Sequence, residues 1–243
     1  MTSVSDNVKS VMDRISSAAL SCGRRAEDIT LVAASKMNGY DALREAYDSG
    51  IRVFGENRVQ ELLEKQKLGA YEGAELHFIG HLQRNKVKNI VGSVSLIHSV
   101  DSIPLLSEIE RRAASLNLVQ DILLELNLAG EEQKSGFPAP LLPDMLDFAS
   151  QCPHILVRGL MTVPPICENT ENNAPVFDLL RQLFVDNSNK KYDNVRMDFL
   201  SMGMSGDFET AIAHGANMVR IGSALFGPRN YAISEVPADG IYG

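Results

Sequence analysis

Short runs of apolar and β-branched residues alternate with amphipathic stretches from residue 30 onward. Eight of these runs have the length and composition of β-strands. They are Thr30–Ser35, Arg52–Phe54, Glu75–Ile79, Leu96–Ser99, Asp121–Asn127, Val157–Thr162, Phe199–Ser201 and Met218–Ile221. Strands that alternate with helices pair in parallel through right-handed crossovers. Because eight such strands close a TIM barrel, we predict an α/β fold consisting of one (β/α)8 barrel.

The stretches between these runs carry apolar residues at helical spacing, which predicts helices on the outside of the barrel. The stripes comprise Leu43, Ala46 and Tyr47; Val59, Leu62 and Leu63; Leu105, Ile109, Ala113 and Leu116; Leu142, Met145, Leu146 and Ala149; and Val176, Leu179, Leu180, Leu183 and Phe184. A further stripe precedes the first strand and consists of Val8, Val11, Met12, Ile15 and Ala19. It predicts an extra N-terminal helix that ends near Gly23.

An open doubly wound sheet is the alternative architecture. It would place a GxGxxG turn after the first strand, where this chain reads LVAASKMNGY. No linker, low-complexity segment or shift in composition divides the chain. We therefore predict a single domain over residues 1–243.

The composition limits the partners and the compartment. The formal net charge is −8, from 23 Lys and Arg against 31 Asp and Glu, which argues against a surface for nucleic acid or anionic membranes. No apolar run approaches the roughly 18 residues of a membrane span, and the first twenty residues lack the apolar core of a signal peptide. Three widely spaced cysteines indicate a reducing compartment. We predict a cytoplasmic protein.

Polar residues stand at or just beyond the ends of the predicted strands. They include Lys36, Glu56, Asn57, His81, Ser99, Asp101, Asn127, Thr162, Ser201, Ser205, Arg220 and Ser223. Loops are polar in any protein, so no one of these residues is informative alone. In a barrel, however, all the strand ends meet at one rim, where the active site of TIM-barrel enzymes lies. Their convergence predicts a site there.

Lys36 ends the apolar run LVAAS, which places its amine in the mouth of the barrel. A desolvated lysine loses its proton more readily and becomes a nucleophile that can form a Schiff base. The plainer interpretation is a lysine whose stem lies along the strand end and whose amine reaches water. Position alone leaves both interpretations open.

The last two strands are followed by turns rich in small residues, SMGMSGDFE and VRIGSALFG. In barrels, the loops after strands 7 and 8 commonly hold a phosphate together with a helix N-terminus. The glycines that permit close approach are Gly203, Gly206 and Gly222, and the hydroxyl donors are Ser201, Ser205 and Ser223. The alternative is that Ser205 or Asp207 only caps a helix.

His77 and His81 are four residues apart in HFIGH, the spacing of a metal site on a helix. They fall on a predicted strand instead, where four residues span roughly 13 Å, too far for one ion. We expect His81 to cap the next helix or to line the rim. No other cluster has metal-ligand spacing, so we predict no metal site.

Several separate blocks resemble the pyridoxal phosphate homeostasis protein family. They are LVAASK, FGENRVQELLEK, HFIGHLQRNKVK, IHSVDS, GLMTVP and LSMGMSGDFETAIAHGANMVRIGSALFG, and together they extend from about residue 30 to residue 227. This family looks like the barrel domain of alanine racemase without its C-terminal β-domain. The resemblance therefore implies a fold-type III barrel that binds pyridoxal 5′-phosphate (PLP).

The resemblance also implies roles for individual residues. PLP would be held as an internal aldimine on Lys36, and Arg220 would face its pyridine nitrogen. Phosphate contacts would come from Ser201, Met202, Gly203, Ser205, Gly222 and Ser223, and the pocket would be lined by Asn57, His81 and Met161. The chain departs from the family in one place, where Met37-Asn38-Gly39 follow the lysine instead of Thr and a later Pro.

A racemase needs two bases on opposite faces of its substrate, and Lys36 supplies at most one. The sixteen residues after Gly227 are too few for a second domain. We therefore predict a monomeric PLP-binding protein of vitamin B6 homeostasis, without a catalytic residue, that stores the cofactor or delivers it to PLP-dependent apoenzymes. A PLP-dependent amino-acid racemase is the alternative. A third hypothesis is a regulatory barrel that binds no PLP.

Overall fold

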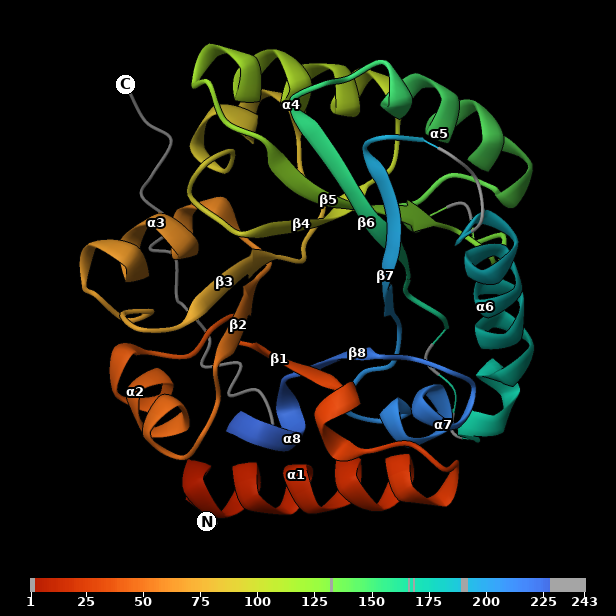
Figure 1. Cartoon of the computed structure of the whole chain (residues 1–243). Helices are drawn as coiled ribbons and strands as arrows, with labels where there is room; N and C mark the ends of the chain where they lie inside the picture. Colours follow the sequence, from red (N-terminus) through yellow and green to blue (C-terminus); the bar gives the residue numbers. More distant parts are fainter. Residues whose placement is uncertain (1–2, 132, 166, 168, 189–191, 228–243) are drawn as a thin grey trace, which may run out of the picture.

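The predicted strands form one closed barrel, in which every strand pairs in parallel with its neighbours in the chain and β8 returns to β1 (Figure 1). The computed structural model describes residues 3–227 except 132, 166, 168 and 189–191. The strands are β1 Thr30–Ala34, β2 Val53–Glu56, β3 Glu75–Phe78, β4 Leu96–Val100, β5 Gln120–Leu126, β6 Ile155–Thr162, β7 Val195–Ser201 and β8 Met218–Ile221. The prediction of a (β/α)8 barrel is confirmed, with strand ends that differ by a few residues.

Helices surround the barrel on its outside (Figure 1). They are α1 Val4–Ser21, α2 Tyr40–Asp48, α3 Val59–Lys67, α4 Ile103–Ser115, α5 Leu142–Ser150, α6 Ala174–Ser188, α7 Phe208–Ala213 and α8 Ser223–Phe226. Four short 3-10 helices are η1 Ala26–Asp28, η2 Arg84–Asn89, η3 Ala139–Leu141 and η4 Thr170–Asn173. The crossover from β3 to β4 contains η2 in place of an α-helix, and η2 buries Val87.

The extra N-terminal helix is α1, as the apolar stripe predicted. It begins with a capping box between Ser3 and Asp6 and buries the predicted apolar residues Val8, Val11, Ile15 and Ala19. It contacts α7 and α8, which follow the last two strands (Figure 1). This contact fixes the turns after β7 and β8 against the N-terminal part of the chain.

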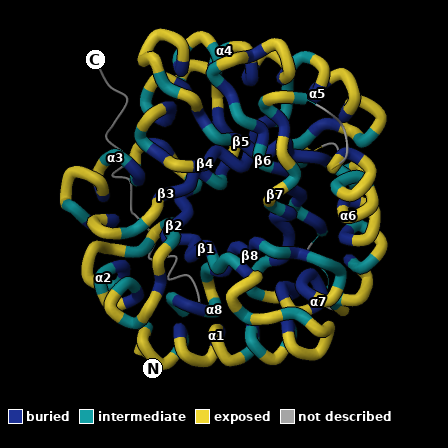
Figure 2. Tube along the Cα trace, in the orientation of Figure 1, coloured by how far each residue is buried: buried dark blue, intermediate teal, exposed yellow. Residues whose placement is uncertain are grey.

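The strands separate two cores. A large outer core lies between the barrel and the helices, whereas the barrel interior is filled by Val32, Leu96, Leu123, Met161 and Met218. Most of the strand residues are buried, except in the first half of β7, and the outer faces of the helices are exposed (Figure 2). Since side chains alternate along a strand, the interior residue Leu123 places Glu125 on the interior side as well, nearer the carboxyl end of β5. No helix within the described ranges has the length and apolar character that crossing a membrane would require.

Candidate functional site

The residues predicted to form a site come together at the carboxyl ends of the strands. Lys36 lies two residues beyond β1 and is half-buried, and Asn57 directly follows β2. Ser201 ends β7, and Arg220 lies on β8 with its guanidinium buried. Because all eight strands are parallel, these ends share one rim of the barrel.

Arg220 is the charged group at the centre of this rim. Its Nη1 donates to Ser201 Oγ at 2.5 Å and its Nη2 donates to the carbonyl oxygen of Thr162 at 2.9 Å. Burial lowers the pKa of Arg220 to about 10, against the opposing effect of the Glu125 charge. The guanidinium is therefore still a cation at neutral pH, and its orientation is fixed by two acceptors.

A row of hydrogen bonds continues from Arg220 through the barrel interior. Ser201 Oγ lies 3.2 Å from His98 Nδ1, and His98 Nε2 lies 3.0 Å from His77 Nδ1. Arginine can only donate hydrogen bonds, so the Ser201 hydroxyl accepts one from Arg220 and donates its own to His98 Nδ1. Both imidazoles then carry their hydrogen on Nε2, and that of His77 points toward Glu75, 3.7 Å away. The row crosses the barrel to a cavity of about 330 Å³ at its opposite end, lined by Glu75 and His77.

The two histidines of this row are neutral. Burial lowers the pKa of His77 to about 4, and burial followed by the charges of His77 and Arg220 lowers the pKa of His98 well below its usual range. Within the described part of the chain, no group of three or more His, Cys, Asp or Glu side chains could hold a metal ion. These imidazoles act as hydrogen-bonding groups that orient Arg220.

We expect this row to make the protein less stable in mild acid. Below the usual histidine pKa of 6.5, the unfolded chain binds protons that the buried imidazoles reject, so the free energy of unfolding decreases as the pH falls. From pH 7.5 to pH 5, His77 alone should lower it by about 2 kcal/mol. Urea unfolding at both pH values measures the change. His77→Asn should show a smaller loss than the wild type, and an equal loss in both would contradict this origin.

The turns after β7 and β8 are tied together by Ser205. Its Oγ accepts from the amides of Gly222 at 3.1 Å and Ala224 at 3.3 Å, so it caps the start of α8, not the helix that follows it in sequence. The Asp207 carboxylate accepts from the Met204 amide at 2.7 Å and from Asn173 Nδ2 at 2.9 Å. The alternative that Ser205 or Asp207 caps a helix is thus confirmed for Ser205, whereas Asp207 occupies the N-cap position of α7 without a side-chain hydrogen bond to that helix.

This arrangement leaves backbone amides that can receive an anion. Among the described residues, no acceptor is found for the amides of Ser205 and Gly206, and Ser223 begins α8, where an amide has no intrahelical acceptor. Gly222 lies against β1, so that a Cβ there would come within 3.3 Å of the Ala34 carbonyl oxygen. The two turns thus have the donors and the close backbone approach that a phosphate group requires.

Other predicted residues differ in how they can contribute. Met161 lies in the barrel interior, whereas the Met202 side chain is buried in the outer core, so only its main chain faces the turn. The Ser201 hydroxyl is engaged by Arg220 and His98. We therefore expect Ser201 to orient Arg220, and we expect the phosphate contacts to begin beyond it. The positive φ of 93° at Gly203 makes the turn that follows.

Asn57 and His81 lie on the β2 and β3 side of the rim. The Oδ1 atom of Asn57 is buried and has no partner among the described residues. His81 is exposed, with Nδ1 3.1 Å from Ser135 Oγ and 3.5 Å from Asp101 Oδ2. Gln83, not His81, precedes η2, so the interpretation of His81 as a helix cap is wrong and its place at the rim is confirmed.

Sequence reasoning missed two groups of this region. Glu125 is buried on the interior side of β5, where burial and then the Asp101 charge raise its pKa to about 7. The signal for it was a carboxylate inside the apolar run DILLEL. The other group comprises Glu61 and Lys65, which pair with the predicted rim residue Glu56 or with each other and contact the residues on either side of Lys36.

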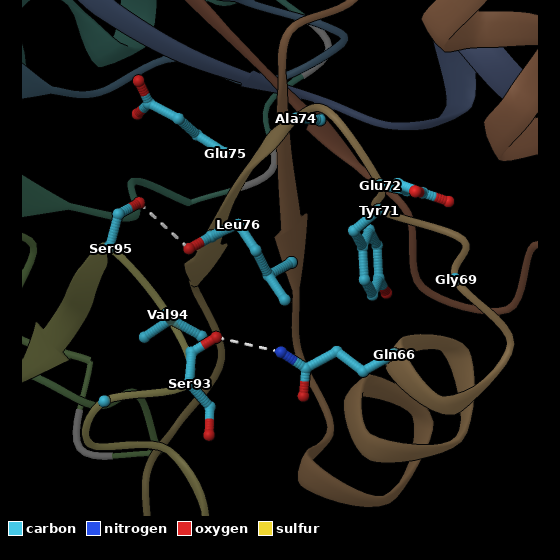
Figure 3. Close-up of a pocket in the computed structure, with 11 residues that line it drawn as sticks. Gln66, Gly69, Tyr71, Glu72, Ala74, Glu75, Leu76, Ser93, Val94 and Ser95 are labelled. Atoms are coloured by element: carbon cyan, nitrogen blue, oxygen red, sulfur yellow. Dashed lines mark hydrogen bonds between the residues drawn. The ribbon is translucent and has the colours of Figure 1, made fainter.

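A larger cavity, of about 670 Å³, lies elsewhere (Figure 3). It is bounded by the segments that enter β3 and β4, and Gln66 Nε2 donates across it to the Ser93 carbonyl oxygen at 3.0 Å. Because these segments precede their strands, this cavity is at the opposite end of the barrel from the rim described above. Its lining includes none of the residues that the sequence predicted for the functional site.

Comparison with known proteins identifies relatives of the whole chain. The family model for the alanine racemase N-terminal domain matches residues 12–230. The pyridoxal phosphate homeostasis protein of Aquifex aeolicus is 45% identical over 226 residues, covering 93% of this chain and 98% of its own. Chain length and sequence therefore both correspond to those of this relative.

Solved structures include one that is similar over most of this chain and one that shares only the fold. PipY of Synechococcus elongatus, solved with PLP bound, has a TM-score of 0.77 and 32% identity, and the match covers 89% of this chain and all of that of PipY. The alanine racemase of Corynebacterium glutamicum has a TM-score of 0.68 at 13% identity, and only 62% of its chain is covered. The similarity to the racemase extends to the barrel fold and no further.

Proposed function

The chain belongs to the family of pyridoxal phosphate homeostasis proteins, and on that premise we propose that it holds PLP on Lys36 and stores or delivers the cofactor without turning over a substrate. One observation carries the proposal. Lys36, the buried cation Arg220 and the amides of Ser205, Gly206 and Ser223 all lie at one rim of the barrel. A ligand that carries an aldehyde and a phosphate on one ring would use the Lys36 amine, the Arg220 guanidinium and the amides of the turns together.

The residues at the rim fit PLP group by group. The amides of the two turns can bind the phosphate, and Arg220 can donate to the pyridine nitrogen. The buried Oδ1 of Asn57 has no partner in the described part of the chain, and a polar group of the cofactor would supply one. The Lys36 amine would condense with the aldehyde carbon, so that a C=N bond forms and water leaves.

Arg220 also explains why we propose no turnover. PLP acts as an electron sink when bound, and it does so best with a protonated ring nitrogen. An arginine remains charged and can only donate hydrogen bonds, so the pyridine nitrogen that faces it would accept one through its lone pair and stay unprotonated. The row from Ser201 to His77 holds the guanidinium in this orientation. The racemase alternative is supported by similarity in fold alone.

We also propose, from the same site, that PLP-dependent apoenzymes receive the cofactor and that the protein acts in the cytoplasm as a monomer. Release needs only an amine that can reach the C=N bond, and Lys36 is half-buried at an open rim. All three cysteines are free thiols, as expected in a reducing compartment.

The visible absorption spectrum of the purified protein tests the proposal. We expect an absorption band from the Schiff base, and we expect borohydride to remove it and fix the cofactor to the protein. Incubation of a separate, unreduced sample with L-alanine in deuterated water should give exchange of the bound cofactor but no D-alanine. A protein without the band would contradict PLP binding, and multiple turnovers of deuterium incorporation at Cα would favour the racemase.

A further inference from the structure

A buried ion-pair cluster, formed by Glu56, Glu61 and Lys65, lies behind the residue that we propose to carry PLP. Glu56 is fully buried at the end of β2, and the Lys65 amine on α3 forms ion pairs with both Glu56 and Glu61. Glu56 Oε1 also accepts from Ser35 Oγ at 2.8 Å and from the Tyr71 hydroxyl at 3.0 Å. A buried charge is costly unless it is paired and hydrogen-bonded, and these contacts satisfy that requirement.

The cluster contacts the main chain on both sides of Lys36. The Lys65 amine donates to the Ser35 carbonyl oxygen at 2.8 Å, and the Met37 amide donates to Glu61 Oε2 at 2.8 Å. The two contacts come from opposite members of an ion pair, so each one helps to place the other. Lys36 is the residue between them.

Met37 has an unfavourable backbone conformation, and its hydrogen bond to Glu61 helps to stabilise that conformation. Its φ is +62°, in the left-handed region that residues other than glycine rarely adopt, and the residue is 52% exposed. Packing of that side chain therefore does little to enforce the turn. Asn38 adds a second restraint, because its Nδ2 donates to the Lys36 carbonyl oxygen at 2.9 Å. The sequence Met37-Asn38-Gly39, which departs from the family, is thus accommodated by a defined turn.

We propose that Glu61 is a positioning residue for Lys36. Through the Met37 amide it fixes the turn directly after the lysine, while Lys65 fixes the strand directly before it. The direction of the Lys36 side chain follows from these two restraints, so the amine meets the aldehyde carbon of PLP that is already held by its phosphate and ring. This inference rests on the proposed function of Lys36.

Two ligands separate positioning of the amine from general damage to the site. PLP and pyridoxine 5′-phosphate share the ring and the phosphate, but pyridoxine phosphate has an alcohol in place of the aldehyde. We expect Glu61→Ala to weaken PLP binding at least about tenfold, since a displaced reactive group loses rate and affinity steeply with distance. Binding of pyridoxine phosphate should be unchanged. Fluorescence or calorimetric titration of the PLP-free protein gives both dissociation constants.

Further variants define the role of the carboxylate. Glu61→Asp keeps the charge beside Lys65 but is one methylene too short to reach the Met37 amide, so it should fold normally and lose the preference for PLP as Glu61→Ala does. Glu61→Gln keeps an acceptor oxygen at the same reach and should restore the preference to within about threefold of the wild type. Glu64→Ala, an exposed position on the same helix, is the matched control and should bind both ligands as the wild type does.

The outcomes distinguish this inference from the proposed function. If the wild type binds PLP and pyridoxine phosphate equally, the proposal that Lys36 forms a Schiff base with PLP is contradicted. If the wild type prefers PLP and Glu61→Asp keeps the full preference, or if the folded Glu61 variants lose both ligands alike, positioning by Glu61 is overturned. A loss confined to PLP, with recovery in Glu61→Gln, supports it.

Discussion

Replacing Lys36 by alanine is expected to remove the visible absorption band of bound PLP completely. The band arises from a C=N bond to a primary amine, and alanine has none to supply. Borohydride should then fix no cofactor to the variant, whereas the wild-type adduct should map to the peptide that contains Lys36. Spectra before and after reduction, together with peptide mass mapping, measure both effects.

The matched control is Lys86→Ala, on η2 next to the same rim. It removes one positive charge, as the Lys36 substitution does, and should leave the band unchanged. A borohydride-fixed adduct that maps to Lys86 or Lys134 would contradict the assignment of Lys36 as the residue that binds PLP covalently. Weak PLP binding that survives in Lys36→Ala is expected, because the turns after β7 and β8 remain intact.

The second large effect concerns the phosphate. Each hydrogen bond from an amide to a charged phosphate contributes about 1.5–3 kcal/mol, so three such bonds should favour PLP over pyridoxal by roughly a thousandfold or more. Gly222→Val should remove most of this preference, because a Cβ at Gly222 lies within 3.3 Å of the Ala34 carbonyl oxygen and 3.4 Å of Ala34 Cβ. The branched side chain has to push apart β1 and the start of α8.

Titration of the wild type and Gly222→Val with both ligands checks this prediction. Ser188→Ala, at an exposed position late in α6, is the control and should bind PLP as the wild type does. Equal affinities of the wild type for pyridoxal and PLP would show that the two turns do not bind the phosphate. A Gly222→Val protein that keeps the full ratio would lead to the same conclusion.

Much of the fold could be predicted from local patterns. The runs around Leu31 and Ile122 have the length of buried strands, and the stripe from Val8 to Ala19 has the period of a helix. These patterns depend on neighbours a few residues apart, and the structure confirms all three elements. Strand ends were less certain, as in β7, which begins at Val195 and not at Phe199, because the exposed polar residues Arg196 and Asp198 interrupt the apolar residues of its first half.

The rim could be predicted for the same reason. Parallel strands all end on one side, so Lys36, Asn57 and Arg220 had to share it once the strand order was known. The sequence by itself thus determined the barrel, the N-terminal helix and the end of the barrel where polar residues collect.

Only the tertiary structure decided which of these groups contact one another. Ser201 and His98 are 103 residues apart, and Lys65 reaches Ser35 across 30 residues, yet each pair forms a hydrogen bond. Such bonds depend on the closure and register of the barrel and on side-chain rotamers, to within a few tenths of an ångström. Hydrophobic periodicity contains no information at that precision. The orientation of Arg220 and the restraint of the turn at Met37 therefore appear only when the chain is folded.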